Sequence, residues 1–226
     1  MSPRPLNLIR VMPAQEEECL MPRIGRLHLV TDATAGRDVP GTVAAALAGG
    51  VDTVQVRVGS AVSDREAFEL AGVVLGLCRA AGATCLVNDR LHVALAVGAD
   101  GGHVGGTDLP VEAARRVLGP RAVLGATARD PDAARLAVAA GADYLGTGPA
   151  YVSTTKTTLP PPIGPAGVAA VADAVEVPVI AIGGVTEETA GALLAAGAHG
   201  VAVVAAICSA DDPRGAAARL ATLVAG

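Results

Sequence analysis

The chain alternates short apolar runs with alanine-rich segments of helical period, and this alternation limits its fold more than any other feature. Eight runs rich in Val, Ile and Leu are predicted strands, at residues 27–32, 52–57, 84–88, 101–104, 122–125, 143–146, 178–183 and 200–204. Helical segments follow them near residues 40–49, 64–81, 90–97, 110–118, 131–140, 165–175, 186–196 and 212–225. Strands that are apolar throughout are covered on both faces, which is typical of a parallel sheet. Alternating βα units give an open doubly wound sheet or a closed barrel, and the count of eight favours a (β/α)8 TIM barrel.

A five-residue pattern recurs four times and supports a fold of repeated units. It reads AGGVD, AVGAD, AAGAD and AAGAH at residues 48–52, 96–100, 139–143 and 195–199. Each copy places a glycine just past a helix end, where left-handed backbone needs no Cβ, and then starts a strand. We expect one barrel domain over residues 25–226. Residues 1–24 are interpreted as a poorly ordered extension, with Met12 and Met21 as alternative starts.

Composition excludes several classes of function. The chain has 226 residues, of which 51% are hydrophobic and 17% charged, and this excludes intrinsic disorder. Aromatic residues make up 1% and the net charge is -5, which argues against nucleic acid as a partner. No apolar run reaches the roughly 18 residues that span a bilayer, so no membrane partner is expected. The four cysteines lack metal-finger spacing, and together with the absence of a secretory signal they favour reduced thiols in the cytoplasm.

Polar residues are scarce, yet they gather where the predicted strands end. These residues are Gln55, Arg57, Asn88, Asp89, Asp108, Thr127, Ser153, Thr155 and Lys156. In a βα barrel the active site lies at the carboxyl ends of the strands. The loop over residues 147–165 is also unusually long for a βα connection, and such loops usually carry function. We therefore expect the site at this end of the barrel.

The residue types at these positions favour anionic ligands with a divalent cation. Asp89 and Asp108 follow adjacent strands, so both carboxylates suit Mg²⁺ that is held partly by phosphate oxygens. Asp108 alone could equally cap the helix near 110–118. Burying Arg57 on an apolar strand is costly without an anionic partner, either a ligand phosphate or a carboxylate at the rim. The run from Ser153 to Lys156 is either an anion clamp or a solvated polar loop.

Small residues after the last two strands predict a phosphate site. Gly183 and Gly184, with the turn at Ala205, match a cradle of backbone N–H groups, although a tight turn would require the same glycines. His28 and His103 are interpreted as structural, and the cysteines as small core residues. The residues alone thus predict binding of one or two phosphorylated small molecules with a divalent cation.

The same residues resemble thiamine-phosphate synthases, from Leu27 to the end of the chain. The motifs that carry the resemblance are LVTD (29–32), GGVDTVQVR (49–57), VNDR (87–90), GADGGHVGGTDLP (98–110), ADYLGTGPAY (142–151), TTK (154–156), AIGGV (181–185) and GVAVVAAI (200–207). The resemblance implies a transferase that joins an aminopyrimidine diphosphate to a thiazole phosphate. Thiamine phosphate forms and pyrophosphate leaves, by ionisation of the pyrimidine–oxygen bond and capture of the carbocation by the thiazole nitrogen.

The resemblance also implies a role for each site residue. Asp89 and Asp108 would hold Mg²⁺, and Arg57 and Lys156 would be the catalytic cations on the leaving pyrophosphate. Substrate-binding roles fall on Gln55, Arg57, Asn88, Thr127, Ser153, Thr155, Lys156, Gly184, Val204 and Ala205. Gln55 and Asn88 would bind the diphosphate or the pyrimidine, and Thr127 would replace a usual serine. The thiazole phosphate would be held by Ser153, Thr155, Gly184 and the backbone near Val204 and Ala205. The partners are then the two phosphorylated small molecules, and a homo-oligomer is left open.

Three positions depart from the family pattern and keep other functions open. Gly59 stands where a lysine is usual, Gly106 replaces a glutamine, and Arg129 lies where histidine is common and could restore the missing charge. The Pro-rich stretch after Lys156 is also atypical. The alternatives are a thiazole tautomerase-like enzyme and a non-catalytic paralogue that binds thiazole phosphate or thiamine phosphate.

Overall fold

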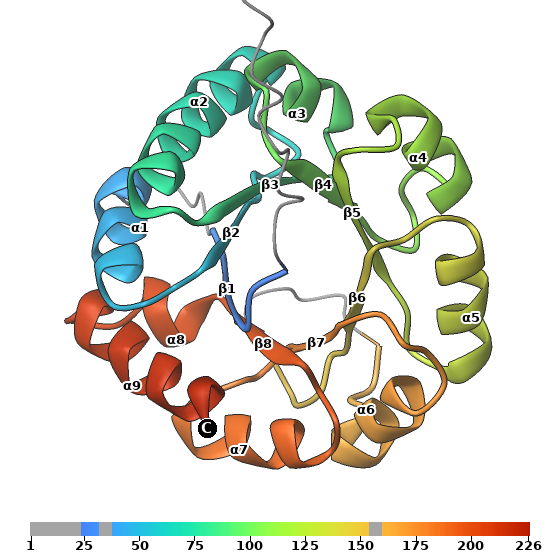
Figure 1. Cartoon of the computed structure of the whole chain (residues 1–226). Helices are drawn as coiled ribbons and strands as arrows, with labels where there is room; N and C mark the ends of the chain where they lie inside the picture. The colour runs from blue at the N-terminus through green and yellow to red at the C-terminus, as the bar shows by residue number, and fades with distance from the viewer. Residues whose placement is uncertain (1–23, 32–37, 154–159) are drawn as a thin grey trace, which may run out of the picture.

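The computed structural model describes residues 24–31, 38–153 and 160–226, and it confirms the predicted barrel. Eight parallel strands pair in chain order and close on one another, with β8 beside β1. Figure 1 looks along the barrel axis, with the strands in the ring and the helices outside it. The strands are β1 (Leu27–Val30), β2 (Thr53–Val56), β3 (Thr84–Asn88), β4 (Gly101–Val104), β5 (Val123–Thr127), β6 (Tyr144–Thr147), β7 (Val179–Ile182) and β8 (Gly200–Val203).

The helices lie close to the expected segments. They are α1 (Val39–Ala48), α2 (Asp64–Ala81), α3 (Leu91–Val97), α4 (Val111–Leu118), α5 (Pro131–Ala139), α6 (Gly164–Ala172), α7 (Glu187–Ala195), α8 (Ala205–Cys208) and α9 (Pro213–Ala225). The short α8 begins at Ala205, where a turn was expected after the last strand. The segment read as an extension, residues 1–24, lies outside the described residues except for Ile24.

Two apolar clusters hold the barrel together. The larger one lies between the sheet and the helices, as expected for strands covered on both faces. The smaller one fills the barrel interior and consists of Val30, Leu86, Val123, Tyr144, Ile180 and Ala202. Alternate residues of each strand point inward, so the interior receives side chains from every second position. The interior is therefore a packed core that ends at the strand tips.

The recurring five-residue pattern has a defined structural role at the start of the strands. A glycine in each copy has positive φ, namely Gly50 (100°), Gly98 (70°), Gly141 (103°) and Gly197 (90°). The aspartate that ends the first three copies accepts hydrogen bonds from backbone N–H groups at or beside the start of the preceding strand. Asp52 binds the amides of Arg26 and Leu27, Asp100 that of Cys85 and Asp143 that of Leu124. In the fourth copy His199 Nε2 lies 3.3 Å from the carbonyl of Ile24 instead.

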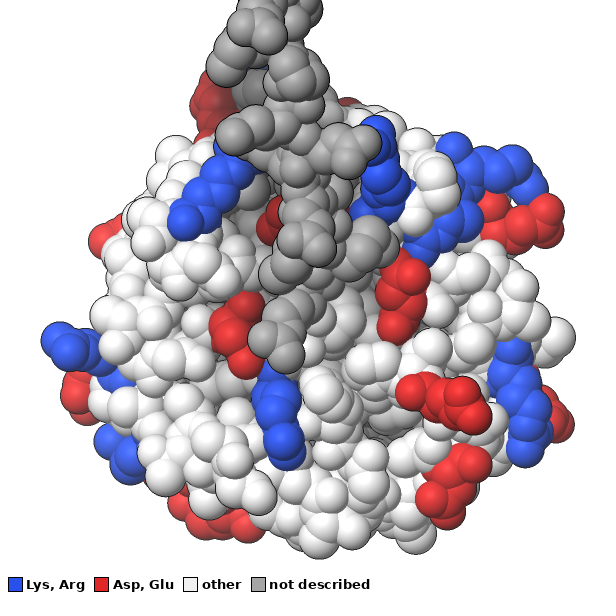
Figure 2. All heavy atoms as spheres, in the orientation of Figure 1, with Lys and Arg blue, Asp and Glu red and all other residues white. Residues whose placement is uncertain are grey.

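The charges on one face and the lengths of the helices bear on possible partners. On the face shown in Figure 2, basic and acidic side chains are interspersed, so this face lacks the basic patch of a phosphate-backbone binder. Among the described residues no helix is long and apolar enough to cross a membrane.

Candidate active site

Four polar side chains form a connected series from the barrel interior to its mouth. Gln55 Nε2 on β2 donates to the Tyr144 hydroxyl on β6 at 3.4 Å. That hydroxyl lies 3.0 Å from His103 Nδ1 on β4, and His103 Nε2 lies 3.0 Å from Thr127 Oγ1 at the end of β5. Gln55, His103 and Tyr144 are buried, while Thr127 is exposed. The series thus links the core to the end of the barrel where substrates are expected.

Burial keeps this series neutral. Desolvation lowers the pKa of His103 to about 4, although the nearby negative charge of Asp108 acts in the opposite direction. Burial also raises the pKa of Tyr144, because a phenolate would lose its hydration. A neutral imidazole donates from one ring nitrogen and accepts at the other. His103 therefore orients the Thr127 hydroxyl without adding charge.

Two glycines make room for the rings of this series. A Cβ on Gly125 would lie 2.2 Å from Cζ of Tyr144, and one on Gly146 would lie 3.0 Å from Cε1 of His103. Both glycines precede the strand ends on β5 and β6. Any larger residue at 125 would have to displace the tyrosine ring.

Sequence reasoning found half of this series. Gln55 and Thr127 were predicted as site residues, but Tyr144 was not considered and His103 was interpreted as structural only. A usable signal was present: Tyr144 is one of three aromatic residues in the chain and stands in a strand of alternating inward positions.

The ends of β3 and β4 bring the predicted metal residues to adjacent loops. Asn88 is the last residue of β3 and is aligned with His103 on β4. Asp89 follows it with a positive φ of 61°, is exposed, and donates its N–H to the carbonyl of His103 at 2.9 Å. Asp108 is half-buried, and its Oδ2 accepts from the Gly105 N–H at 2.7 Å.

The structure rules out the alternative role for Asp108 and fits a magnesium ion only in part. Helix α4 has Pro110 at its N-cap and no side-chain cap, so Asp108 does not cap it. Among the described residues no group of three His, Cys, Asp or Glu side chains could hold a metal. Asp89, Asp108 and the side-chain amide of Asn88 all offer oxygen atoms as metal ligands. Mg²⁺ commonly binds one or two carboxylates and completes its coordination shell with phosphate oxygens and water. The donor set thus suits a metal that arrives with a diphosphate.

Two arginines at this end have different surroundings. Arg57 is half-buried, and its backbone exchanges hydrogen bonds with the Thr31 hydroxyl, which joins the ends of β1 and β2. Arg129, the residue expected to restore a missing charge, donates to the carbonyls of Gly148 and Pro161 at 3.0 and 2.7 Å. Arg129 thereby holds both ends of the long loop after β6.

The structure explains the glycine pair after β7 by packing. Gly183 and Gly184 have φ of 94° and 65°, and a Cβ on Gly184 would lie 2.5 Å from the Val152 carbonyl. The glycines therefore form the tight turn that was one of the two interpretations. The phosphate site at this turn stays a prediction. Val204 and Ala205 form the turn into α8. Ser153 is half-buried in the loop after β6, whereas Thr155 and Lys156 lie outside the described residues.

Comparison with known proteins assigns the chain to a family. A sequence model described as "Thiamine monophosphate synthase" matches residues 27–207, which include all eight strands. The chain belongs to the thiamine monophosphate synthase family. A "Thiamine-phosphate synthase" from Salinispora tropica is 60% identical over 202 residues, which cover 88% of this chain and 97% of that protein. One from Salinispora arenicola is 62% identical over 200 residues, 88% of this chain and 96% of that protein.

A solved structure extends the likeness to the barrel itself. The thiamine phosphate pyrophosphorylase from Pyrococcus furiosus superposes with a TM-score of 0.81 and 34% sequence identity, over 88% of this chain and 95% of that one. In this member of the thiamine monophosphate synthase family, the described residues that are expected to act lie near or after the ends of strands β2 to β8, at one end of the barrel.

Proposed function

We propose that the chain couples an aminopyrimidine diphosphate to a thiazole phosphate, as a thiamine-phosphate synthase, with Mg²⁺ and with release of pyrophosphate. The 60% identity to a thiamine-phosphate synthase across nearly the whole barrel carries this proposal. The oxygen donors after β3 and β4 and the arginine after β2 support it, since they suit a metal-bound diphosphate. The reaction would take place in the cytoplasm.

The reaction needs charge stabilisation and positioning more than a nucleophile or a strong base. The carbon–oxygen bond between pyrimidine methylene and diphosphate breaks with its electron pair on pyrophosphate. The thiazole nitrogen then donates its lone pair to the methylene carbon. Mg²⁺, when bound, neutralises charge on the leaving diphosphate. Arg57 and Lys156 add positive charge there, and the lowered pKa of His103 makes it only a weak base.

The buried polar series supplies orientation for the pyrimidine. Thr127 presents its hydroxyl at the mouth, fixed by His103 Nε2 at 3.0 Å. Gln55 lies deeper, with its amide fixed by Tyr144. Groups held by neighbours lose little freedom on binding, which lowers the entropic cost of aligning a substrate. We assign Gln55, Thr127 and Asn88 to the pyrimidine diphosphate. To the thiazole phosphate we assign Ser153, Thr155, Gly184, Val204 and Ala205.

Pyrophosphate release from purified protein tests the proposal. The assay contains both substrates and Mg²⁺, with thiamine phosphate followed in parallel and each component omitted in turn. We expect turnover that needs both substrates and stops with a chelator. Binding of thiazole phosphate without turnover would contradict the synthase and favour the tautomerase-like or non-catalytic alternative.

A further inference from the structure

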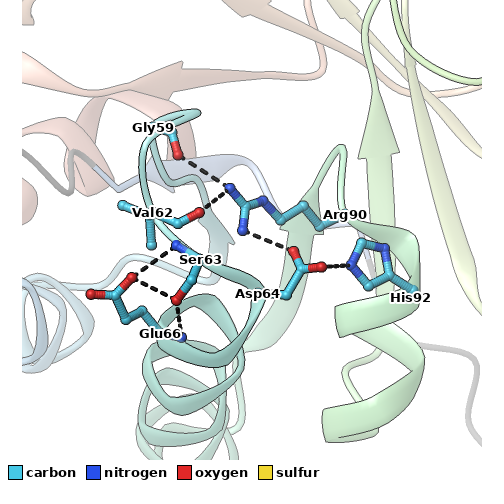
Figure 3. A network of polar contacts seen from close by, with 7 residues as sticks. All are labelled: Gly59, Val62, Ser63, Asp64, Glu66, Arg90 and His92. Carbon is cyan, nitrogen blue, oxygen red and sulfur yellow. Dashed lines mark hydrogen bonds and ion pairs between the residues drawn. The ribbon is translucent and has the colours of Figure 1, made fainter.

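The guanidinium of Arg90 ties the loop after β2 to the turn after β3. Nη2 donates to the carbonyls of Gly59 and Val62 at 3.2 and 2.6 Å, and Nη1 pairs with Asp64 Oδ1 at 3.0 Å. The Arg90 side chain is only 18% exposed, and its bond to the Val62 carbonyl is partly buried, whereas Asp64 is 65% exposed. Figure 3 shows the fork reaching across from the start of α3 to the Gly59–Asp64 segment.

The turn that carries Arg90 also carries the candidate metal residue. Asp89 is the one non-glycine residue with positive φ in the described parts of the chain. The Arg90 N–H donates to the carbonyl of Asn88 at 2.6 Å, which closes the turn. Three consecutive residues therefore present an amide, a carboxylate and the guanidinium that holds the neighbouring loop.

Among the described residues, the neighbouring loop has few other hydrogen bonds before α2 begins. Ser63 and Glu66 form a capping box, with Ser63 N–H donating to Glu66 Oε2 at 2.8 Å, so the chain is fixed from Ser63 onward. Ahead of that cap, the Val62 N–H bonds the Gly59 carbonyl at 3.1 Å within the loop itself. His92 Nε2 lies 3.0 Å from Asp64 Oδ2, but both side chains are more than half exposed. Among the described residues, Arg90 is thus the mostly buried side chain that links this loop to the turn after β3.

From this geometry we propose that Arg90 is a positioning residue for Arg57, Asn88 and Asp89, the residues assigned to the pyrimidine diphosphate. It sets the distance between Arg57, which precedes the held loop, and Asn88 and Asp89, which precede Arg90 itself. This inference rests on the proposed function, which assigns those residues to the diphosphate. The thiazole phosphate residues follow β6, β7 and β8, and β7 lies opposite β3 in the ring. The effect of Arg90 is therefore confined to one substrate.

The fork geometry explains why arginine is needed at this place. A planar guanidinium satisfies two carbonyls and a carboxylate at once, whereas an ammonium is a point charge on a flexible stem. Arg90→Lys keeps the charge and loses most of the geometry, and Arg90→Gln loses both. The two variants therefore form a graded series.

Calorimetric titration with each substrate separates positioning from general stability. The Mg²⁺ complex of the aminopyrimidine diphosphate and, separately, thiazole phosphate are titrated onto the wild type, Arg90→Lys, Arg90→Gln and the control Arg116→Gln. Arg116 pairs with Glu112 on the surface of α4 and is 67% exposed. We expect Arg90→Gln to weaken binding of the pyrimidine diphosphate about 10-fold, with Arg90→Lys intermediate and thiazole phosphate within about twofold throughout. The KM values in the pyrophosphate assay should split in the same way.

Three results would overturn this inference: equal weakening of both ligands, no weakening in Arg90→Gln, or a wild type that binds no pyrimidine diphosphate. Thermal unfolding of each variant shows whether a loss of both comes from unfolding. A wild type that binds the diphosphate without turnover, and loses that binding in Arg90→Gln, would contradict the proposed synthase while supporting the role of Arg90.

Discussion

The two ends of the barrel use the same residue type in opposite ways. At the end where the strands begin, the carboxylates of Asp52, Asp100 and Asp143 accept strand N–H groups at 2.7 to 3.1 Å. At the other end Asp89 is exposed in left-handed backbone, and Asp108 holds one N–H of its own loop. The aspartates that accept hydrogen bonds from a neighbouring strand stabilise the fold. Asp89 and Asp108 lie instead at the end of the barrel where the active sites of βα barrels lie.

Changing the candidate metal aspartates tests the ligand end and should have the largest effect. Asparagine tolerates left-handed backbone as aspartate does, so Asp89→Asn keeps the turn and removes the charge. We expect Asp89→Asn or Asp108→Asn to reduce pyrophosphate release at least about 100-fold. The free energy of unfolding should change by less than about 0.5 kcal/mol.

The control is Asp132→Asn, which removes an exposed aspartate paired with Arg135 on α5. It should match the wild type in both activity and urea unfolding. Full activity in Asp89→Asn would show that its carboxylate holds no metal.

Acid pH should weaken the fold through the buried histidines. Desolvation lowers the pKa of His103 and of His28 to about 4. The unfolded chain, with histidines near pH 6.5, takes up protons first as the pH falls, so stability is greatest above about pH 6.5 and declines toward pH 4. Each ring contributes on the order of 3 kcal/mol to that decline.

Urea unfolding between neutral pH and about pH 4.5 measures this decline. His103→Gln should make the pH dependence of the free energy of unfolding shallower. An unchanged slope in His103→Gln would contradict a neutral buried imidazole.

The same substitution at the other end should act on stability alone. Asp143 accepts from the Leu124 N–H and pairs with Arg115 at 2.6 Å, with 39% of its side chain exposed. Because that exposure screens the pair, we expect Asp143→Asn to cost about 1–2 kcal/mol and a few degrees in Tm. The KM values of the substrates should stay the same. A loss of activity without a loss of stability would contradict a purely structural role for Asp143.

Restoring a cation at the mouth should have the smallest effect. A Cβ on Gly59 would meet nothing within 4 Å, so a side chain can start there without a clash at its first atom. Gly59→Lys should lower the KM for the pyrimidine diphosphate by about two- to fivefold, because an exposed cation attracts the diphosphate through water-screened charge. Gly59→Ala is the control for backbone stiffening, and equal KM values for Lys and Ala would show that no charge is missing there.

Local sequence patterns predicted the fold well, but they did not predict contacts between residues far apart in the sequence. Apolar runs and glycine-bearing helix ends depend on near neighbours, so eight strands and their helices were foreseen within a few residues. The repeated aspartate was seen as a pattern, but its partners lie in another strand. The fork of Arg90 was missed because its acceptors are 26 to 31 residues away.

The site was predicted where the strand ends fix it. Gln55, Asn88, Asp89 and Thr127 lie at the expected end because the barrel topology dictates that placement. Tyr144 was missed because its contact with His103 requires knowing the inward positions of two strands. Arg129 was expected to supply charge, and only the structure shows its hydrogen bonds to the loop after β6.

The spacing of the ties at the strand starts has a consequence for the order of assembly. Asp52, Asp100 and Asp143 each join two successive strands through residues 25, 15 and 19 positions apart. His199 and Ile24, at the seam between β8 and β1, are 175 positions apart. Closing a short chain segment costs less entropy than closing a long one, so the three strand pairs can form early and separately. We therefore expect the seam between β8 and β1 to close late, because it joins segments far apart in the chain.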